Sequence, residues 1–455
     1  MKTNKNATEL GEDPIGKLLA KLSIPATIGM LVLLLYNVVD MIFVSYYVGT
    51  MAVGGLSIVL PISMLISSIG MSIGIGGGSM IARNLGAKKH EVANKVMGNM
   101  LVLNFSLIGI ATLIGFLAME KVLILFGAGG EIFQYAKDYF FIILLGMPFF
   151  SFAMLFNNVA RSEGKAKTAM VTMLISALVN LVLDPIFIIY LDWGIQGAAW
   201  ATVISQLCAL AFLLWFFLTK KSVITIHKKF WSWEAKIIKE ISAIGSSSMA
   251  RQGAAGLVAI VVNHALLKYG GELSIAVYGI LVRIVMMVVF PLFGLAQGMM
   301  PLVGFNLGAR KYERMEESLS KSIMIASGLS ILMFICIFFF SESFVRIFSE
   351  DPEVIVMGTR ALRIINIALP FIGFQILGSV YFQAIGRVKP AIILTVSRQL
   401  LFLAPLVWFL SNFYGLDGVW YAFPIADTLS TLLVAAYIVP EWKELKFKME
   451  RTKSN

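Results

Sequence analysis

Long apolar segments alternate with short polar connectors along almost the whole chain. An α-helix needs about 20 apolar residues to cross the hydrocarbon core of a bilayer, so each segment predicts a transmembrane helix. Twelve are expected, near residues 18–45, 53–80, 96–118, 132–158, 168–190, 196–218, 237–267, 274–302, 318–340, 354–384, 390–412 and 417–439. The pattern predicts an all-α integral membrane protein with twelve transmembrane helices.

A sequence repeat divides these helices into two sets of six. Residues 84–91 read Asn-Leu-Gly-Ala-Lys-Lys-His-Glu, and residues 306–313, which lie 222 positions later, read Asn-Leu-Gly-Ala-Arg-Lys-Tyr-Glu. The same offset relates Lys165 to Arg387. Because six is even, both halves enter the membrane from the same side, as do the parallel repeats of carriers that bind substrate between two halves. The repeat predicts two pseudo-symmetric six-helix lobes.

The repeat and the connectors also predict the boundaries of the parts. We expect an N-terminal lobe at 1–218, a cytoplasmic linker at 219–236, a C-terminal lobe at 237–440 and a cytoplasmic tail at 441–455. Trp231 and Trp233 are expected to anchor the linker at the membrane interface. The polar first ~17 residues lack the pattern of a removable signal peptide.

Composition and charge agree with a membrane protein. The chain is 58% hydrophobic and 14% charged, whereas soluble chains hold about 25% charged residues. Of its 37 Lys and Arg residues, 28 lie at the termini and in the even-numbered connectors, and only 6 lie in the odd-numbered ones. Both termini are therefore expected in the cytoplasm, with the helices in the cell membrane among lipids. The chain has a formal net charge of +11, which could suggest that it binds nucleic acid. The placement of the basic residues in the connectors argues against that partner.

The chain shows no pattern of catalytic or metal-binding residues. Its two cysteines, Cys208 and Cys336, lie inside apolar segments, and its three histidines are scattered. Neither set has the spacing of a disulfide framework or a metal site. No nucleophile with a neighbouring base is visible, so we expect neither an enzyme nor a cofactor.

Two acidic residues within predicted spans are the strongest functional candidates. A carboxylate deep in a bilayer costs about 3 kcal/mol unless it faces a polar interior. Ser176, Asn180 and Asp184 follow one another at intervals of four residues, so they form a polar stripe on one helix face. Pro185 lacks an N–H group, which is expected to leave the carbonyl of Leu181 free to bind a cation or water.

Asp40 lies in another predicted span, with Tyr36 and Asn37 on the same helix face. We expect Asp40 and Asp184 to meet. Their repeat partners are Val262 and Leu406, so any ion site is confined to the first lobe.

The two carboxylates, the Asn180 amide and the Thr202 hydroxyl would form an all-oxygen site suited to Na⁺. The same pair could equally hold a proton, because neighbouring carboxylates raise the pKa of one of them.

The second half also has polar residues within its predicted spans: Arg251, His264, Arg283, Gln297, Gln375, Arg398 and Asp427. They indicate a polar, partly cationic interior. Two interpretations remain open, namely structural pairing of Arg with Asp and contact with a substrate. Of this group, Arg283, Gln297 and Arg398 are the candidates for a substrate cavity or its supporting network.

In combination, five motifs resemble those of the multidrug and toxic compound extrusion (MATE) family, and of its DinF-like branch in particular. They are Tyr36-Asn-Val-Val-Asp40, Asn84-Leu-Gly-Ala with its repeat, Arg161-Ser-Glu-Gly-Lys-Ala-Lys167, Asn180-Leu-Val-Leu-Asp184-Pro185, and Pro301-Leu-Val-Gly-Phe-Asn306-Leu-Gly-Ala309. The resemblance covers essentially the whole chain. It implies a V-shaped carrier of two six-helix lobes.

The resemblance also implies roles for single residues. The first-lobe cation network would be Asp40, Asn180, Asp184 and Thr202. Tyr36, Tyr139 and Asn157 would lie nearby, and the first helix would bend at Pro25.

The sequence departs from the family's patterns at two places. The NorM-like branch has acids in its seventh and tenth spans. This chain has none at mid-membrane there, so a second cation site is not expected. The Arg161-Ser-Glu-Gly164 turn departs from the commoner Arg-Gly-x-Gly form, which we expect to affect a loop and not the site.

The resemblance further implies an antiporter that exports amphipathic, often cationic, drug-like molecules in exchange for H⁺ or Na⁺. A flippase for lipids or lipid-linked precursors would share the two-lobe architecture, and a strongly cationic central cavity would favour it. A non-transporting scaffold or receptor would need no buried acids. We expect a monomer.

Overall fold

The computed structural model describes residues 5–219 and 221–453, and its regular structure there is helical. Ten helical segments in this part of the chain are long and apolar enough to cross a membrane. Two of the ten contain a glycine with positive φ, Gly271 (φ 68°) and Gly415 (φ 57°), at which the helix reverses into a second span. The described residues thus form twelve spans, and the predicted all-α membrane fold is confirmed.

The chain divides into two compact units, of which unit 1 comprises residues 1–13 and 24–249. Its elements are α1 (Lys5–Glu12), α2 (Ile15–Phe43), η1 (Val44–Val48), α3 (Thr50–Gly86), α4 (His90–Leu117), α5 (Met119–Leu125), α6 (Gly130–Ser162), α7 (Ala166–Pro185), η2 (Ile186–Tyr190), α8 (Gly194–Leu218) and η3 (Lys228–Phe230). Helix α6 packs between α3 and α8, and α8 also packs against α7. The close approach of α3 to α6 requires glycine, since a Cβ on Gly70 would lie 2.4 Å from the carbonyl oxygen of Ser151.

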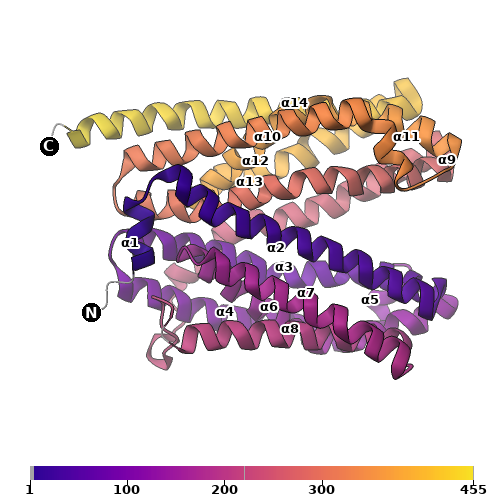
Figure 1. Ribbon diagram of the computed structural model, residues 1–455, viewed down its shortest axis with the longest axis horizontal. Coiled ribbons are helices and arrows are strands. Elements are labelled where there is room, and N and C mark those ends of the chain that lie inside the picture. The colour runs from indigo at the N-terminus through magenta and orange to yellow at the C-terminus, as the bar shows by residue number, and fades with distance from the viewer. Residues whose placement is uncertain (1–4, 220, 454–455) are drawn as a thin grey trace. The chain divides into compact units, whose positions relative to one another are not determined.

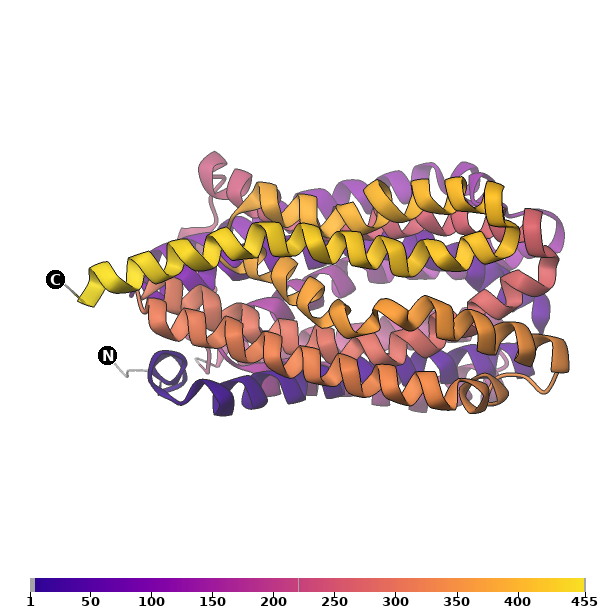
Figure 2. The same cartoon turned by 90° about the horizontal axis from the view of Figure 1, so that it is seen from above.

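Unit 2 comprises residues 14–23 and 250–455. Its elements are α9 (Ala235–Gly308), α10 (Tyr312–Arg346), α11 (Pro352–Ile365), η4 (Asn366–Ala368), α12 (Leu369–Ala384), α13 (Val388–Val396), η5 (Ser397–Leu403) and α14 (Ala404–Lys453). Helix α12 packs against α10 and α14, which run beside one another in Figures 1 and 2.

The unit boundaries differ from the predicted lobe boundaries, because the chain passes between units inside helices. In α2 the change falls between Ser23 and Ile24, next to Pro25, and in α9 it falls between Met249 and Ala250. The linker expected at 219–236 therefore belongs with unit 1.

The repeat seen in the sequence is present in the backbone as well. Left-handed φ angles recur at the same offset of 222 residues, or 221 for the last pair: Gly49 with Gly271, Lys88 with Arg310, Gly164 with Gly386, and Gly194 with Gly415. Three of the four pairs are glycine, which adopts a positive φ without steric cost, and all four pairs place turns at equivalent positions of the two halves.

A buried carboxylate in the α6–α7 turn binds the linker. Glu163 is 0% exposed, and it accepts hydrogen bonds from the Ser222 hydroxyl and from the backbone N–H groups of Val223 (3.0 Å) and Ile224 (3.3 Å). We call these four residues the linker clasp. Glu163 occupies the variable position of the Arg161-Ser-Glu-Gly164 turn, and through it this turn fixes the linker to unit 1.

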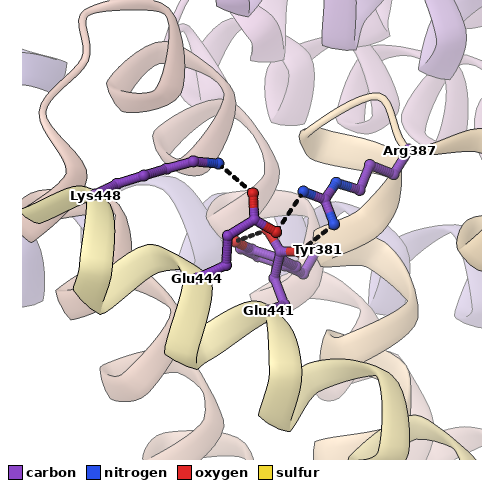
Figure 3. Close-up of polar contacts among 5 residues, drawn as sticks. All are labelled: Tyr381, Arg387, Glu441, Glu444 and Lys448. Carbon is purple, nitrogen blue, oxygen red and sulfur yellow. Dashed lines mark hydrogen bonds and ion pairs between the residues drawn. The ribbon is translucent and has the colours of Figure 1, made fainter.

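The second half has a counterpart with different chemistry, shown in Figure 3. Arg387 in the α12–α13 turn forms ion pairs with Glu441 and Glu444 of α14, and Lys448 also pairs with Glu444 at 2.7 Å. At the offset of 222, Lys165 corresponds to Arg387 and Ser222 to Glu444. Each half thus binds the segment that follows its last span to the turn between its fourth and fifth spans.

The linker clasp is expected to loosen as the pH rises. Burial raises the pKa of Glu163 from 4.5 to about 7, and this effect outweighs the three hydrogen bonds, which favour the charged form. When the linker detaches, Glu163 is hydrated and its pKa returns toward 4.5. Between these two pKa values the attached state holds a proton that the detached state releases, so attachment weakens from about pH 4.5 to about pH 7 and is level above that.

Trypsin cleavage after Lys228 and Lys229 measures this detachment. We expect the cleavage rate of the wild type, divided by that of Glu163→Gln, to rise up to about pH 7 and then level off. The pH dependence of trypsin itself cancels in the ratio. A ratio that does not change with pH would contradict the role of Glu163 in the pH dependence of linker attachment.

Candidate functional site

Asp40 on α2 and Asp184 on α7 come together inside unit 1. Their side chains are only 8% and 1% exposed, and the two carboxyl groups lie within hydrogen-bonding reach of one another. Asn180, one turn before Asp184 on the same face of α7, donates its Nδ2–H to Asp184 Oδ1 at 3.2 Å. The meeting of the two acids that was expected from sequence is therefore present.

Helices α6 and α8 add hydroxyl groups to this cluster. Tyr139 of α6 is 5% exposed, and its hydroxyl lies close to the side chain of Thr202 on α8. Tyr139 also lies within electrostatic range of Asp40, Asp184 and Tyr36. The site thus draws polar side chains from four helices, α2, α6, α7 and α8.

The backbone widens next to both acids. The π-helix η1 begins four residues after Asp40, and the π-helix η2 begins directly after Pro185. In these segments Gly49 N–H donates to the carbonyl of Val44 at 3.1 Å, and Leu191 N–H donates to the carbonyl of Ile186 at 2.9 Å, each five residues back. Such π turns occur mostly at functional sites, because they reorient neighbouring side chains without ending the helix.

Three buried oxygen atoms in the cluster have no hydrogen-bond partner among the described residues: Asp40 Oδ1, Asn180 Oδ1 and Asp184 Oδ2. Buried polar atoms are nearly always paired, so three unpaired acceptors at one place indicate a missing donor or cation. Carboxylate, amide and hydroxyl oxygens are ligands for a hard cation such as Na⁺, and a proton shared between the carboxyls would also satisfy one oxygen. The residues present therefore fit either ion.

Two of the expected neighbours are not placed in the cluster. Asn157 donates its Nδ2–H to the carbonyl of Ala169 at 2.9 Å, where it joins α6 to α7. Ala169 precedes Asp184 by 15 residues, or about 22 Å along a helix, so the expectation that Asn157 lies beside the cation site is wrong. The side chain of Asn37 lies outside the described residues.

In unit 2, Arg398 and Asp427 form an ion pair in which the carboxylate is buried and the arginine is half-buried. Arg398 Nε donates to Asp427 Oδ1 and its Nη2 donates to Oδ2 at 3.2 Å, an arrangement that matches the fork of the guanidinium to the carboxylate. Asp427 is 2% exposed, and Arg398 lies in the π-helix η5. Of the two interpretations left open by the sequence, structural pairing is therefore the one that the contacts favour for Arg398.

The remaining candidates of unit 2 lie on α9. Arg283 is exposed and Gln297 is half-buried. Arg251 is half-buried, and its guanidinium lies over the ring of Phe293 at 5.3 Å, a cation–π contact.

A model of the MatE family matches residues 25–186 and 256–409, which is more than half of the chain. The chain belongs to the MATE family. MATE proteins are transporters, so the activity of this protein is transport and not the catalysis of a chemical reaction. The predicted resemblance is confirmed.

Relatives and solved structures agree over nearly the full length. The multidrug export protein MepA of Staphylococcus aureus (strain MSSA476) is 27% identical over 421 residues, which are 92% of this chain and 93% of that protein. A ligand-bound structure of the MATE multidrug transporter DinF-BH is 42% identical, with a TM-score of 0.89 over 94% of this chain and 96% of that one. A crystal structure of MATE in the bent conformation is 29% identical, with a TM-score of 0.93 over 100% of both chains.

Proposed function

We propose that this MATE transporter exports amphipathic, often cationic, drug-like molecules in exchange for H⁺ or Na⁺. The paired carboxyls of Asp40 and Asp184 carry the proposal, because an integral membrane protein retains such groups only where they do work that offsets their cost. The similar MepA proteins are named multidrug export proteins, and DinF-BH is named a multidrug transporter, which supports this class of substrate.

The coupling ion would be held by Asp40, Asn180, Asp184 and Thr202. Two carboxylates in contact and away from water repel one another, so the site is stable only when a proton or a cation lowers its net charge. A bound Na⁺ would supply that positive charge. Asn180 orients Asp184 through its amide, and Tyr139 lies beside Thr202.

Exchange requires that occupancy of this site changes the conformation of the helices that bind substrate. Asp40 lies on α2, and Pro25, four turns earlier on the same helix, lies beside the point where the chain passes from unit 2 to unit 1. A proline inside a helix removes one backbone hydrogen bond and favours a bend there. We therefore propose that α2 bends near Pro25 when the ion binds, and that substrate and ion compete through this change.

Competition between ion and substrate tests the proposal. Added Na⁺ or a lowered pH should weaken binding of a fluorescent cationic substrate to the purified protein in detergent. Substrate should weaken ion binding by the same factor, because coupling between two sites is reciprocal. Thr202→Val distinguishes the ions, since it removes a ligand that Na⁺ needs and a proton does not. Substrate affinity that is indifferent to both ions would contradict the proposed antiport.

We further propose that the protein lies in the cell membrane with both termini in the cytoplasm, on the basis of its basic residues. Single cysteines test this in a chain from which Cys208 and Cys336 have been removed. Lys89→Cys should react with an impermeant reagent only after the cells are opened, whereas Lys121→Cys should react in intact cells. The reverse pattern would invert the topology.

The flippase alternative is less well supported. A strongly cationic cavity would favour a flippase. The positive charge of Arg398 is compensated by its ion pair with Asp427, so Arg398 does not supply such a charge.

A further inference from the structure

The linker from 221 to 236 lies on unit 1 with one face buried. Ser222, Ile224 and Phe230 are 7%, 1% and 7% exposed. A Cβ on Gly98 of α4 would lie 1.8 Å from the carbonyl oxygen of Phe230, so the linker backbone rests directly on that helix. Figure 1 shows the linker at the ends of α4 and α8.

Side chains of α4 fix the rest of this face. Asn94 accepts the backbone N–H of Thr225 at 2.9 Å, and Asn99 accepts that of Glu234 at 2.7 Å. Asn99 also donates to the Ser232 hydroxyl at 3.2 Å. Together with the linker clasp, these bonds hold the segment near its start and near its end, so its opposite face is presented in a defined arrangement.

The opposite face is basic and aromatic. Trp231 and Trp233 are 52% and 59% exposed, although tryptophan is ordinarily well buried. The exposed lysines of the segment are Lys221, Lys228, Lys229 and Lys236. Glu234 is the only acid among these sixteen residues, so the segment has a formal charge of +3.

We propose that this face binds anionic lipid headgroups of the adjacent membrane leaflet. The segment joins α8 to α9, two membrane-spanning helices, so it lies within a few residues of the bilayer surface. Tryptophan next to lysine is typical of the headgroup region, where the indole ring packs among lipids and the ammonium groups attract lipid phosphates. Clusters of lysine beside a membrane span are attracted to anionic lipids by the charge of the membrane surface.

The bonds of the buried face favour this binding. A free loop would have to be ordered when it binds lipid, at a cost in conformational entropy. Here Glu163, Asn94 and Asn99 already hold the backbone, so the lysines and tryptophans are ordered before lipid binds. A lipid surface accounts for both kinds of exposed residue, whereas free phosphate would account for the lysines alone.

Local protection from trypsin tests the proposal in the full chain. We compare nanodiscs of phosphatidylcholine with nanodiscs that also hold phosphatidylglycerol, and we measure cleavage after Lys228 and Lys229 relative to cleavage after Lys88 and Lys89. The second pair is exposed, equally basic and part of the same unit, but no tryptophan lies beside it. The relative cleavage should fall about tenfold in phosphatidylglycerol, and high salt should abolish the difference.

Two further arms separate lipid from other partners. Inorganic phosphate added to phosphatidylcholine nanodiscs should give no protection, and protection there would assign the face to a soluble anion. Trp231→Ser with Trp233→Ser should lose most of the protection in phosphatidylglycerol, whereas Trp408→Ser, at another exposed tryptophan (68%), should keep it. Equal relative cleavage in both lipids, or full protection without the two tryptophans, would overturn the proposal.

Discussion

Asp40→Asn and Asp184→Asn should each reduce gradient-driven export about 100-fold while the protein remains folded and inserted. Coupling between two sites is typically worth up to about 150-fold in affinity, and either change removes the charge through which this coupling acts. Asparagine keeps the size and hydrogen-bonding capacity of the side chain, so packing of the buried site is preserved. Efflux of a fluorescent cation from loaded vesicles under an imposed H⁺ or Na⁺ gradient measures the effect.

A matched control lies eight residues beyond Asp184. Asp192 is exposed and has a left-handed backbone (φ 52°), which asparagine also adopts readily. Asp192→Asn should therefore export at the wild-type rate. Wild-type export by either Asp40→Asn or Asp184→Asn, at matched expression, would disprove the role of the pair.

The architecture could be predicted because it follows from strong, periodic signals. Membrane spans need long apolar segments, and a repeat of eight positions at one offset cannot easily arise by chance. The Gly164 and Gly386 turns show the same repeat in the backbone, as positive φ angles of 79° and 75°. The positions of the spans could therefore be predicted. The points inside α2 and α9 at which the chain leaves one unit and enters the other could not, because the apolar pattern of these helices does not change there.

The part of the site that could be predicted is the pair of acids, because a carboxylate inside a membrane span is energetically costly. Asp40 and Asp184 were identified because a carboxylate in a span needs a polar partner, and each was the natural partner of the other. Only the resemblance predicts Asn157 beside the site, and its partner in the structure is a backbone carbonyl on α7, a contact that a sequence does not display.

Contacts between distant segments were the least predictable. In the sequence, Glu163 occupies the variable position of the Arg161-Ser-Glu-Gly164 turn and gives no signal of a contact, whereas in the structure it is completely buried and holds the linker. An acid in a polar turn is ordinarily exposed, so its burial depends on Ser222 and Val223, about 60 residues later. Likewise, the π turns beside Asp40 and Asp184 depend on packing between η1, η2 and α8, because residue propensities do not distinguish a π turn from an α-helix.

Asp427→Leu should destabilise the protein by about 3 kcal/mol, because it leaves the guanidinium of Arg398 without its carboxylate. The expected value lies at the lower end for a broken buried pair, since the Arg398 side chain remains 32% exposed while Asp427 is 2% exposed. Replacing both partners, as Arg398→Met with Asp427→Leu, should restore most of the loss, because no uncompensated charge then remains. Thermal unfolding of the purified proteins in detergent measures all three variants.

A second Arg–Asp pair of unit 2 provides the control for this cycle. Arg360 and Asp417 are 2.7 Å apart, but their side chains are 63% and 36% exposed, so Asp417→Leu should cost less than about 1 kcal/mol.

Export by the double variant, Arg398→Met with Asp427→Leu, then decides between the two interpretations of Arg398. If the pair is structural, a restored unfolding temperature will be accompanied by restored export. If Arg398 contacts substrate, stability will return while export of cationic and anionic compounds changes in opposite directions, because a positive charge has been removed from the path.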